Sequence, residues 1–329
     1  MRPQPSSPSA PLDERRRRVV EKLERELGQT VLGLLRDPTV TDIMLNPDGR
    51  LWVDRLGKPM ELVGTMTASN AEALMGTVAS TLGSELTRES PILECELPID
   101  GSRFEALIPP VAPAPVFAIR LKAVAIFTLA DYVGAGVMTE RQCALIKGAV
   151  ARRQNILVVG GTGTGKTTLS NAIIHEISEA APDHRLVIIE DTAEIQCSAQ
   201  NAVMLRAVDG TDMTRLLKAT LRLRPDRICV GEVRDGAALA LLKSWNTGHP
   251  GGVSTIHANS GGRAGLVRLE QLIGEVSVLP MGRLIGEAVN WVVGIEKTPQ
   301  GLRRVREVLS IAPTEAGGYQ FLNEERNDE

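Results

Sequence analysis

The stretch Asn155-Ile156-Leu157-Val158-Val159-Gly160-Gly161-Thr162-Gly163-Thr164-Gly165-Lys166-Thr167-Thr168 decides the fold. Its apolar first part predicts a buried strand, which leads directly into the pattern G-x-x-x-x-G-K-T. A loop of this kind curls its backbone N–H groups around phosphate oxygens at the positive end of the following helix. Apolar residues at helical spacing follow the loop, at Leu169, Ala172, Ile173 and Ile177. We therefore expect residues 160–168 to bind a nucleoside triphosphate.

The pattern also assigns roles to two side chains of the loop. Lys166 is at the position that reaches the β- and γ-phosphates, and Thr167 is where a hydroxyl ligates Mg²⁺. A plain glycine-rich connector between a strand and a helix would not need a lysine at that position. The expected cofactors are therefore a nucleotide and Mg²⁺.

The composition is that of a globular protein of 329 residues, long enough for one or two domains. Against 40 Asp and Glu stand 37 Lys and Arg, and the net charge of -3 argues against a protein that mainly coats nucleic acid. The four cysteines are far apart and have no metal-site spacing, which favours reduced thiols in a cytosolic protein. No apolar run approaches the roughly 18–20 residues that cross a bilayer. We expect a cytoplasmic protein whose membrane contacts go through partners.

Composition divides the chain into five segments. Residues 1–12 are rich in Pro and Ser, which predicts disorder. Residues 13–125 mix helices, short strands and hairpin turns, which predicts a small α+β domain. A linker is expected over 126–136, an α/β domain over 137–313, and a loose polar tail over 314–329.

Four apolar segments of the second half predict strands of a parallel sheet that is covered on both faces, at 156–159, 186–189, 227–230 and 253–256. Polar groups follow each strand. Glu190 and Asp191 follow the second, Glu232 follows the third, and His257 follows the fourth. Since the carboxyl ends of parallel strands meet at one edge of a sheet, these groups should converge on the phosphate loop.

The ordered set resembles the traffic ATPases of type II secretion, type IV pili and type IV secretion. The boxes that carry the resemblance are the phosphate loop, an acidic box, Gly231-Glu232-Val233-Arg234-Asp235 and a histidine box. The N-terminal segments Asn46-Pro47-Asp48-Gly49, Asp100-Gly101-Ser102-Arg103 and Phe117-Ala118-Ile119-Arg120 are similar to the type IV secretion branch. The resemblance covers nearly the whole chain.

The resemblance implies the fold class and the assembly. The fold is α/β, with a RecA-like P-loop C-terminal domain that contains a mainly parallel sheet, plus a smaller α+β N-terminal domain. The family forms hexameric rings in the cytoplasm that are peripheral at the inner membrane when assembled with secretion-complex components. ATP hydrolysis in such a ring drives transport through a membrane-spanning complex. ATP, rather than GTP, is expected from the family.

The resemblance also implies site residues. Glu232 would polarise the attacking water, and His257 would sense the γ-phosphate or link it to the neighbouring subunit. Arg103 and Arg120 would reach the triphosphate from the N-terminal domain, since a guanidinium grips phosphate oxygens in two places.

The acidic box, Glu190 and Asp191, would lie at the nucleotide, with Glu190 orienting Mg²⁺ through water. The role of Glu194 stays open.

Each role has a simpler alternative. Glu232 could be a surface acid paired with Arg234, and Arg103 and Arg120 could be ordinary surface arginines. The role of His249 is left open. The same holds for a basic helix face that consists of Arg215, Lys218, Arg222 and Arg224.

Two other functions also fit part of the pattern. One is a RecA-like nucleic-acid translocase, against which stand the acidic net charge and the lack of a path of basic and aromatic residues. The other is a noncatalytic nucleotide-gated scaffold, which would have no need for a water-activating acid. Direct nucleic acid binding, the cargo and the residues that contact adenine are left undecided.

Overall fold

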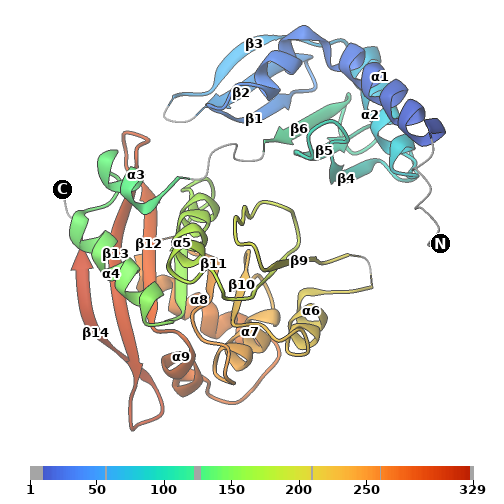
Figure 1. Cartoon of the computed structure of the whole chain (residues 1–329). Coiled ribbons are helices and arrows are strands. Elements are labelled where there is room, and N and C mark those ends of the chain that lie inside the picture. Colours follow the sequence, from blue (N-terminus) through green and yellow to red (C-terminus); the bar gives the residue numbers. More distant parts are fainter. Residues whose placement is uncertain (1–9, 56–57, 122–126, 209, 260, 327–329) are drawn as a thin grey trace, which may run out of the picture. The chain divides into compact units, whose positions relative to one another are not determined.

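The computed structural model describes residues 10–55, 58–121, 127–208, 210–259 and 261–326. The chain divides into two compact units, Met1–Val124 and Ala125–Glu329 (Figure 1). Each unit has its own sheet and its own buried core. In the part of the chain that is described, no helix combines the length and the apolar character that crossing a bilayer requires.

In its described residues, the first unit has two helices and a six-stranded antiparallel sheet with the strand order β3-β2-β1-β6-β5-β4. Helix α1 packs against α2 and β1, and one of its faces buries Leu23, Leu27 and Val31 in the core. The elements are α1 (Ala10–Leu35), β1 (Val40–Leu45), β2 (Arg50–Arg55), β3 (Glu61–Thr65), α2 (Ala68–Thr81), β4 (Ile92–Glu96), β5 (Arg103–Leu107) and β6 (Val116–Arg120).

The second unit contains an eight-stranded sheet in the order β14-β13-β12-β7-β11-β10-β8-β9. The six strands from β12 to β9 are parallel, and β13 and β14 are antiparallel additions. The elements are α3 (Leu129–Gly134), α4 (Glu140–Ala151), β7 (Ile156–Gly160), α5 (Lys166–Ala180), β8 (Leu186–Glu190), β9 (Ala202–Arg206), α6 (Met213–Thr220), β10 (Arg227–Val230), α7 (Ala237–Trp245), β11 (Val253–His257), α8 (Gly261–Gly274), α9 (Gly282–Ala288), β12 (Trp291–Lys297), β13 (Arg303–Pro313) and β14 (Tyr319–Arg326).

Helices cover both faces of this sheet, and alternate strand residues therefore enter two different cores. In β7, Ile156 and Val158 belong to the cluster that includes residues of α3, α4 and α5. Leu157 and Val159 belong to the cluster that includes residues of α7, α8 and α9. The four predicted strands occur as β7, β8, β10 and β11, each within one residue of its predicted ends.

The predicted linker over 126–136 is wrong for most of its length. Residues 129–134 form helix α3, which Thr128 begins through a capping box with Asp131. Leu129 and Tyr132 of this helix are buried in the core of the second unit. The segment is therefore part of the α/β unit, because its apolar side chains have a core to enter.

The predicted tail over 314–329 is also wrong, since Tyr319–Arg326 forms β14 beside β13. Tyr319 and Phe321, two residues apart, pack on the core from the same face of the strand. Their alternation is short and most of the surrounding residues are polar, so the sequence pattern of the strand is weak. At the other end, residues 1–9 of the segment predicted to be disordered lie outside the described residues, and α1 begins at residue 10.

A buried arginine joins the elements at the amino ends of the parallel strands. Arg227, the first residue of β10, is 1% exposed. Its guanidinium donates to His184 Nδ1 at 3.0 Å and to the carbonyl oxygens of Gly251 and Val150, both at 3.1 Å. Burial lowers the pKa of Arg227. Its hydrogen bonds satisfy two buried carbonyl groups and a half-buried imidazole, which makes it a structural residue of the sheet.

Arg227→Met should lower the free energy of unfolding by about 3 kcal/mol, because buried carbonyl groups are left without donors. Chemical denaturation of the full chain measures this. Arg222→Met, at an exposed position nearby, serves as the control and should change stability by less than about 0.5 kcal/mol. Equal stability of the two variants would mean that Arg227 contributes no more than a surface side chain.

Candidate active site

The phosphate loop connects β7 to α5 and depends on its glycines. Gly163 and Gly165 have φ angles of +70° and +96°, in the left-handed region that favours glycine. Gly160 lies so close to β12 that an added Cβ would be 2.4 Å from the carbonyl oxygen of Ile295. Helix α5 has no side-chain cap at its N-terminus, which leaves its first N–H groups to an anion.

Parallel pairing brings the predicted boxes to the same edge of the sheet. His257, at the end of β11, is opposite Gly160 at the end of β7. Val230 of β10 is opposite Ser254 of β11 and Ile189 of β8. The residues that follow these strand ends therefore gather around the phosphate loop.

Lys166, His257 and Glu232 form a contact chain there. Lys166 Nζ donates to the Gly161 carbonyl oxygen at 2.8 Å and lies 3.2 Å from His257 Nδ1. His257 Nε2 lies 3.4 Å from Glu232 Oε2. Lys166 is buried, and the Glu232 side chain is 16% exposed. Three residues that were predicted from separate boxes thus meet in one cluster.

Arg234 ties this cluster to the acidic box. Its Nε lies 2.9 Å from Glu232 Oε1, and Nη1 lies 2.7 Å from Asp191 Oδ2. The hydrogen bond to Glu232 raises the pKa of Arg234. The pairing of Glu232 with Arg234, which was considered as the simpler alternative, is therefore present, together with the contact to His257. Arg234 is thus a further site residue, and its place in the G-E-x-R-D box is the sequence signal that marks it.

The two glutamates of the acidic box differ in their surroundings. Glu190 is 4% exposed, and its Oε2 accepts the N–H groups of Glu194 and Ile195. Burial raises the pKa of Glu190 to about 6. Glu194, in contrast, accepts a hydrogen bond from the Thr167 hydroxyl at 3.2 Å. The carboxylate beside the predicted Mg²⁺ ligand is thus Glu194, and Glu190 holds the turn that carries it.

Arg103 and Arg120 meet in the first unit. They are directly opposite each other on β5 and β6. Arg120 Nε donates to Asp42 Oδ1 at 3.0 Å, and its side chain is 48% exposed. Each arginine also has an acidic neighbour across the sheet, since Asp42 is opposite Arg120 and Glu96 is opposite Arg103, so the sheet itself partly compensates the charge of the pair.

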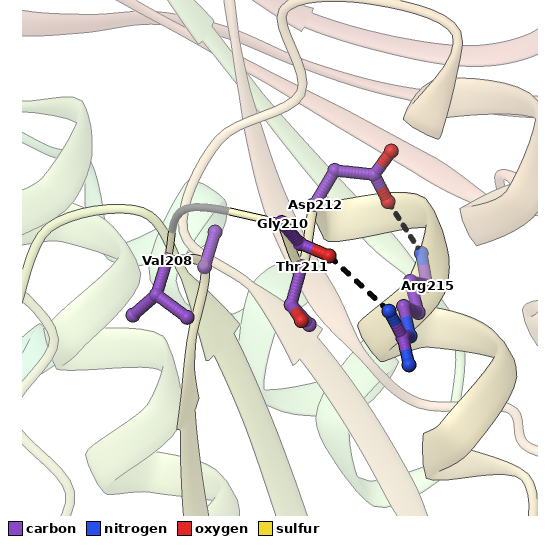
Figure 2. A pocket seen from close by; sticks show the side chains of 6 residues that line it. Val208, Gly210, Thr211, Asp212 and Arg215 are labelled. Carbon is purple, nitrogen blue, oxygen red and sulfur yellow. Dashed lines mark hydrogen bonds between the residues drawn. The ribbon is translucent and has the colours of Figure 1, made fainter.

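Other candidates lie elsewhere. His249 precedes β11, at the amino ends of the strands, and its Nδ1 is 3.0 Å from the Pro225 carbonyl oxygen. Of the basic helix face, Arg215 borders a hollow of about 590 Å³ between β9 and α6, where it donates to the Gly210 carbonyl oxygen (Figure 2). The Arg215 N–H group donates to Asp212. Arg215 therefore stabilises the first turn of α6 through these contacts.

Two further basic residues, Lys297 and Arg303, lie beside the phosphate loop from the β12–β13 hairpin. They belong to no motif, so no sequence signal marks them as site residues. Within the described residues, no group of three or more His, Cys, Asp or Glu side chains could hold a metal ion by itself.

The fold and these boxes define a secretion ATPase family, and the comparison with known families agrees. Residues 25–295 match the family described as type II/IV secretion system protein. The chain belongs to this family, and the resemblance predicted from its boxes is confirmed.

Two relatives are particularly similar. The chain is 54% identical over 312 residues to the probable conjugal transfer protein TrbB of Sinorhizobium fredii, covering 95% of both chains. It is 56% identical over 303 residues to the conjugal transfer protein TrbB of Rhizobium radiobacter, covering 92% of this chain and 93% of the relative. The solved ATPase DotB of Legionella pneumophila is 18% identical, with a TM-score of 0.59, over 98% of this chain and 84% of that chain. The last likeness confirms the predicted fold class.

The raised pKa of Glu190 predicts a pH dependence. The folded state binds the proton of the Glu190 carboxyl more tightly than the unfolded state does. This protonation therefore stabilises the folded protein fully below pH 4.5, and its contribution is lost as the pH rises through about 6. Between pH 4.5 and 7, the free energy of unfolding of the parent should therefore fall by about 2 kcal/mol relative to Glu190→Gln. Denaturant titrations at several pH values measure the difference.

Glu179→Gln, at an exposed position of α5, is the control and should keep the parent's decline. If Glu190→Gln and the parent show the same pH profile, the Glu190 carboxyl is not desolvated as described.

Proposed function

We propose that this chain is an ATPase that hydrolyses ATP with Mg²⁺ and powers a type IV secretion or conjugative transfer machine. The observation that carries the proposal is the contact chain of Lys166, His257 and Glu232 beside the glycine-rich loop. Family membership and the two relatives named TrbB support the setting.

The loop residues Gly160, Gly161, Thr162, Gly163, Thr164, Gly165, Lys166, Thr167 and Thr168 bind the polyphosphate. Lys166 donates to the Gly161 carbonyl oxygen, and a phosphate oxygen is a stronger acceptor for an ammonium group. Nucleotide binding thus exchanges a neutral partner of Lys166 for a charged one.

The Thr167 hydroxyl and the Glu194 carboxylate supply two neighbouring oxygens, 3.2 Å apart. Hard oxygen donors in this number suit Mg²⁺, which keeps several waters and takes further ligands from phosphates. When bound, Mg²⁺ would neutralise charge on the β- and γ-phosphates. Glu194 takes the role first expected of Glu190, because the Glu190 carboxylate serves two backbone N–H groups.

Glu232 acts as the base that accepts a proton from the attacking water. Its pair with Arg234 orients the carboxylate and also competes for its oxygens. Arg234 has Asp191 as a second partner, so it can release one oxygen of Glu232 without losing all charge compensation. His257, between Lys166 and Glu232, senses whether the γ-phosphate is present.

Arg103 and Arg120 complete the proposal from the first unit. The two arginines are directly opposite each other on β5 and β6, and the triphosphate is the anion we assign to them. We further propose that six chains form a cytoplasmic ring, peripheral at the inner membrane through partner proteins. A site that needs groups from a neighbour requires a head-to-tail interface, which can close into a ring.

The alternatives receive less support. A nucleotide-gated scaffold needs no acid beside the loop, whereas Glu232 is in contact with both His257 and Arg234. A nucleic-acid translocase needs a basic path, and the net charge of -3 provides no general one.

The chemistry is tested by two substitutions. Lys166→Ala should lose both nucleotide affinity and turnover, because it removes a contact that every bound nucleotide makes. Glu232→Gln should keep ATP bound and lose turnover, because only water activation is removed. Equilibrium binding of a fluorescent ATP analogue and phosphate release measure the two effects. Glu179→Gln is the control. Phosphate release by Glu232→Gln within about threefold of the parent rate would exclude Glu232 as the base.

The role of the first unit is tested by Arg120→Ala, which should reduce turnover at least tenfold without unfolding the protein, since arginines that meet transition-state charge contribute roughly 10³–10⁵ in rate. Arg103→Ala should act in the same direction. Arg50→Ala, an exposed arginine of the same sheet, is the matched control. Parent-like turnover in Arg120→Ala would mean that Arg120 is an ordinary surface arginine with no role in hydrolysis.

A further inference from the structure

Two basic residues meet where the β12–β13 hairpin passes the phosphate loop. Strand β12 runs parallel to β7, so its carboxyl end lies at the edge where the loop begins. Lys297, the last residue of β12, is directly opposite Arg303, the first residue of β13. A Cβ added at Gly163 would lie 3.5 Å from Lys297 Nζ, and one at Gly165 would lie 3.3 Å from Arg303 Nε. Both side chains therefore approach the loop.

On one face of this hairpin a carboxylate lies between two arginines, and on the other face two basic residues are directly opposite each other. Glu296 Oε1 and Oε2 pair with Arg304 Nη2 at 2.8 Å and Arg306 Nη1 at 3.4 Å. On the face toward the loop, Arg303 Nε is buried and, among the described residues, has no hydrogen-bond partner. Like charges directly opposite each other destabilise a pair of strands, and a buried N–H without a partner adds to the cost. An anion between the hairpin and the loop would offset both.

We propose that Lys297 and Arg303 bind the α- and β-phosphates of the nucleotide, an inference that rests on the proposed function. In the strand order, β11 and β7 separate β12 from β10 and β8. Since Glu232 and Glu194 follow β10 and β8, the γ-phosphate and Mg²⁺ belong to that side. The cations of the hairpin then meet the phosphates nearer the ribose, which ADP and ATP share.

The test is equilibrium binding of ADP, and of a non-hydrolysable ATP analogue, to full-length variants with Mg²⁺. Arg303→Gln should weaken the binding of both nucleotides by roughly tenfold or more, because a charge-assisted hydrogen bond to phosphate is lost. Lys297→Gln, at an exposed position, should weaken the binding of both nucleotides by roughly threefold. The affinity of Arg303→Lys for both nucleotides should lie between that of Arg303→Gln and that of the parent. This variant tests the proposal even if Arg303→Gln fails to fold.

Arg304→Gln removes a positive charge from the face of the same hairpin that carries Glu296, and it should bind both nucleotides within about twofold of the parent. Parent-like binding of both nucleotides by Arg303→Gln would overturn the proposal, as would weaker binding of the ATP analogue alone, which would place Arg303 at the γ-phosphate. A parent protein that binds neither nucleotide would instead contradict the proposed function. Thermal unfolding of each variant separates lost affinity from lost fold.

Discussion

The parallel pairing of β8, β10, β11 and β7 is the constraint on which the site depends. In each strand the apolar residues are buried on both faces, so the register is fixed by packing and a slip of one residue would exchange the two cores. The polar groups directly after the strands inherit this register. His257 is opposite Gly160 for that reason, and Glu232 is held within reach of both His257 and Arg234.

Much of this could be predicted from the sequence. The glycine-rich loop and the four apolar strands have local signals, and parallel pairing makes their ends converge, so Lys166, His257 and Glu232 were predicted together. Roles within the acidic box were harder, because burial and backbone hydrogen bonds distinguish Glu190 from Glu194 and neither has a sequence signal. Lys297 was missed because a hairpin outside any motif brings it to the loop.

Acidic and basic side chains lie on different sides of the phosphate loop. Carboxylates follow β8 and β10, where the proposed function requires Mg²⁺ and water, and cations of the β12–β13 hairpin lie beside the loop glycines. Arg234 joins the carboxylates of Glu232 and Asp191 and limits their repulsion. Under the proposed function, a bound polyphosphate would have its γ-phosphate toward the carboxylates and its other phosphates toward the cations of the hairpin.

The most direct test of the account is an experimental structure of the full chain with Mg²⁺ and a non-hydrolysable ATP analogue. We predict that the polyphosphate occupies the loop, that Lys166 Nζ leaves the Gly161 carbonyl oxygen, with which it now makes a 2.8 Å contact, for phosphate oxygens, and that Glu232 faces the γ-phosphate. An analogue bound elsewhere, or bound in the loop with Glu232 turned away from the γ-phosphate, would contradict the central claim that these strand ends form a site for ATP hydrolysis.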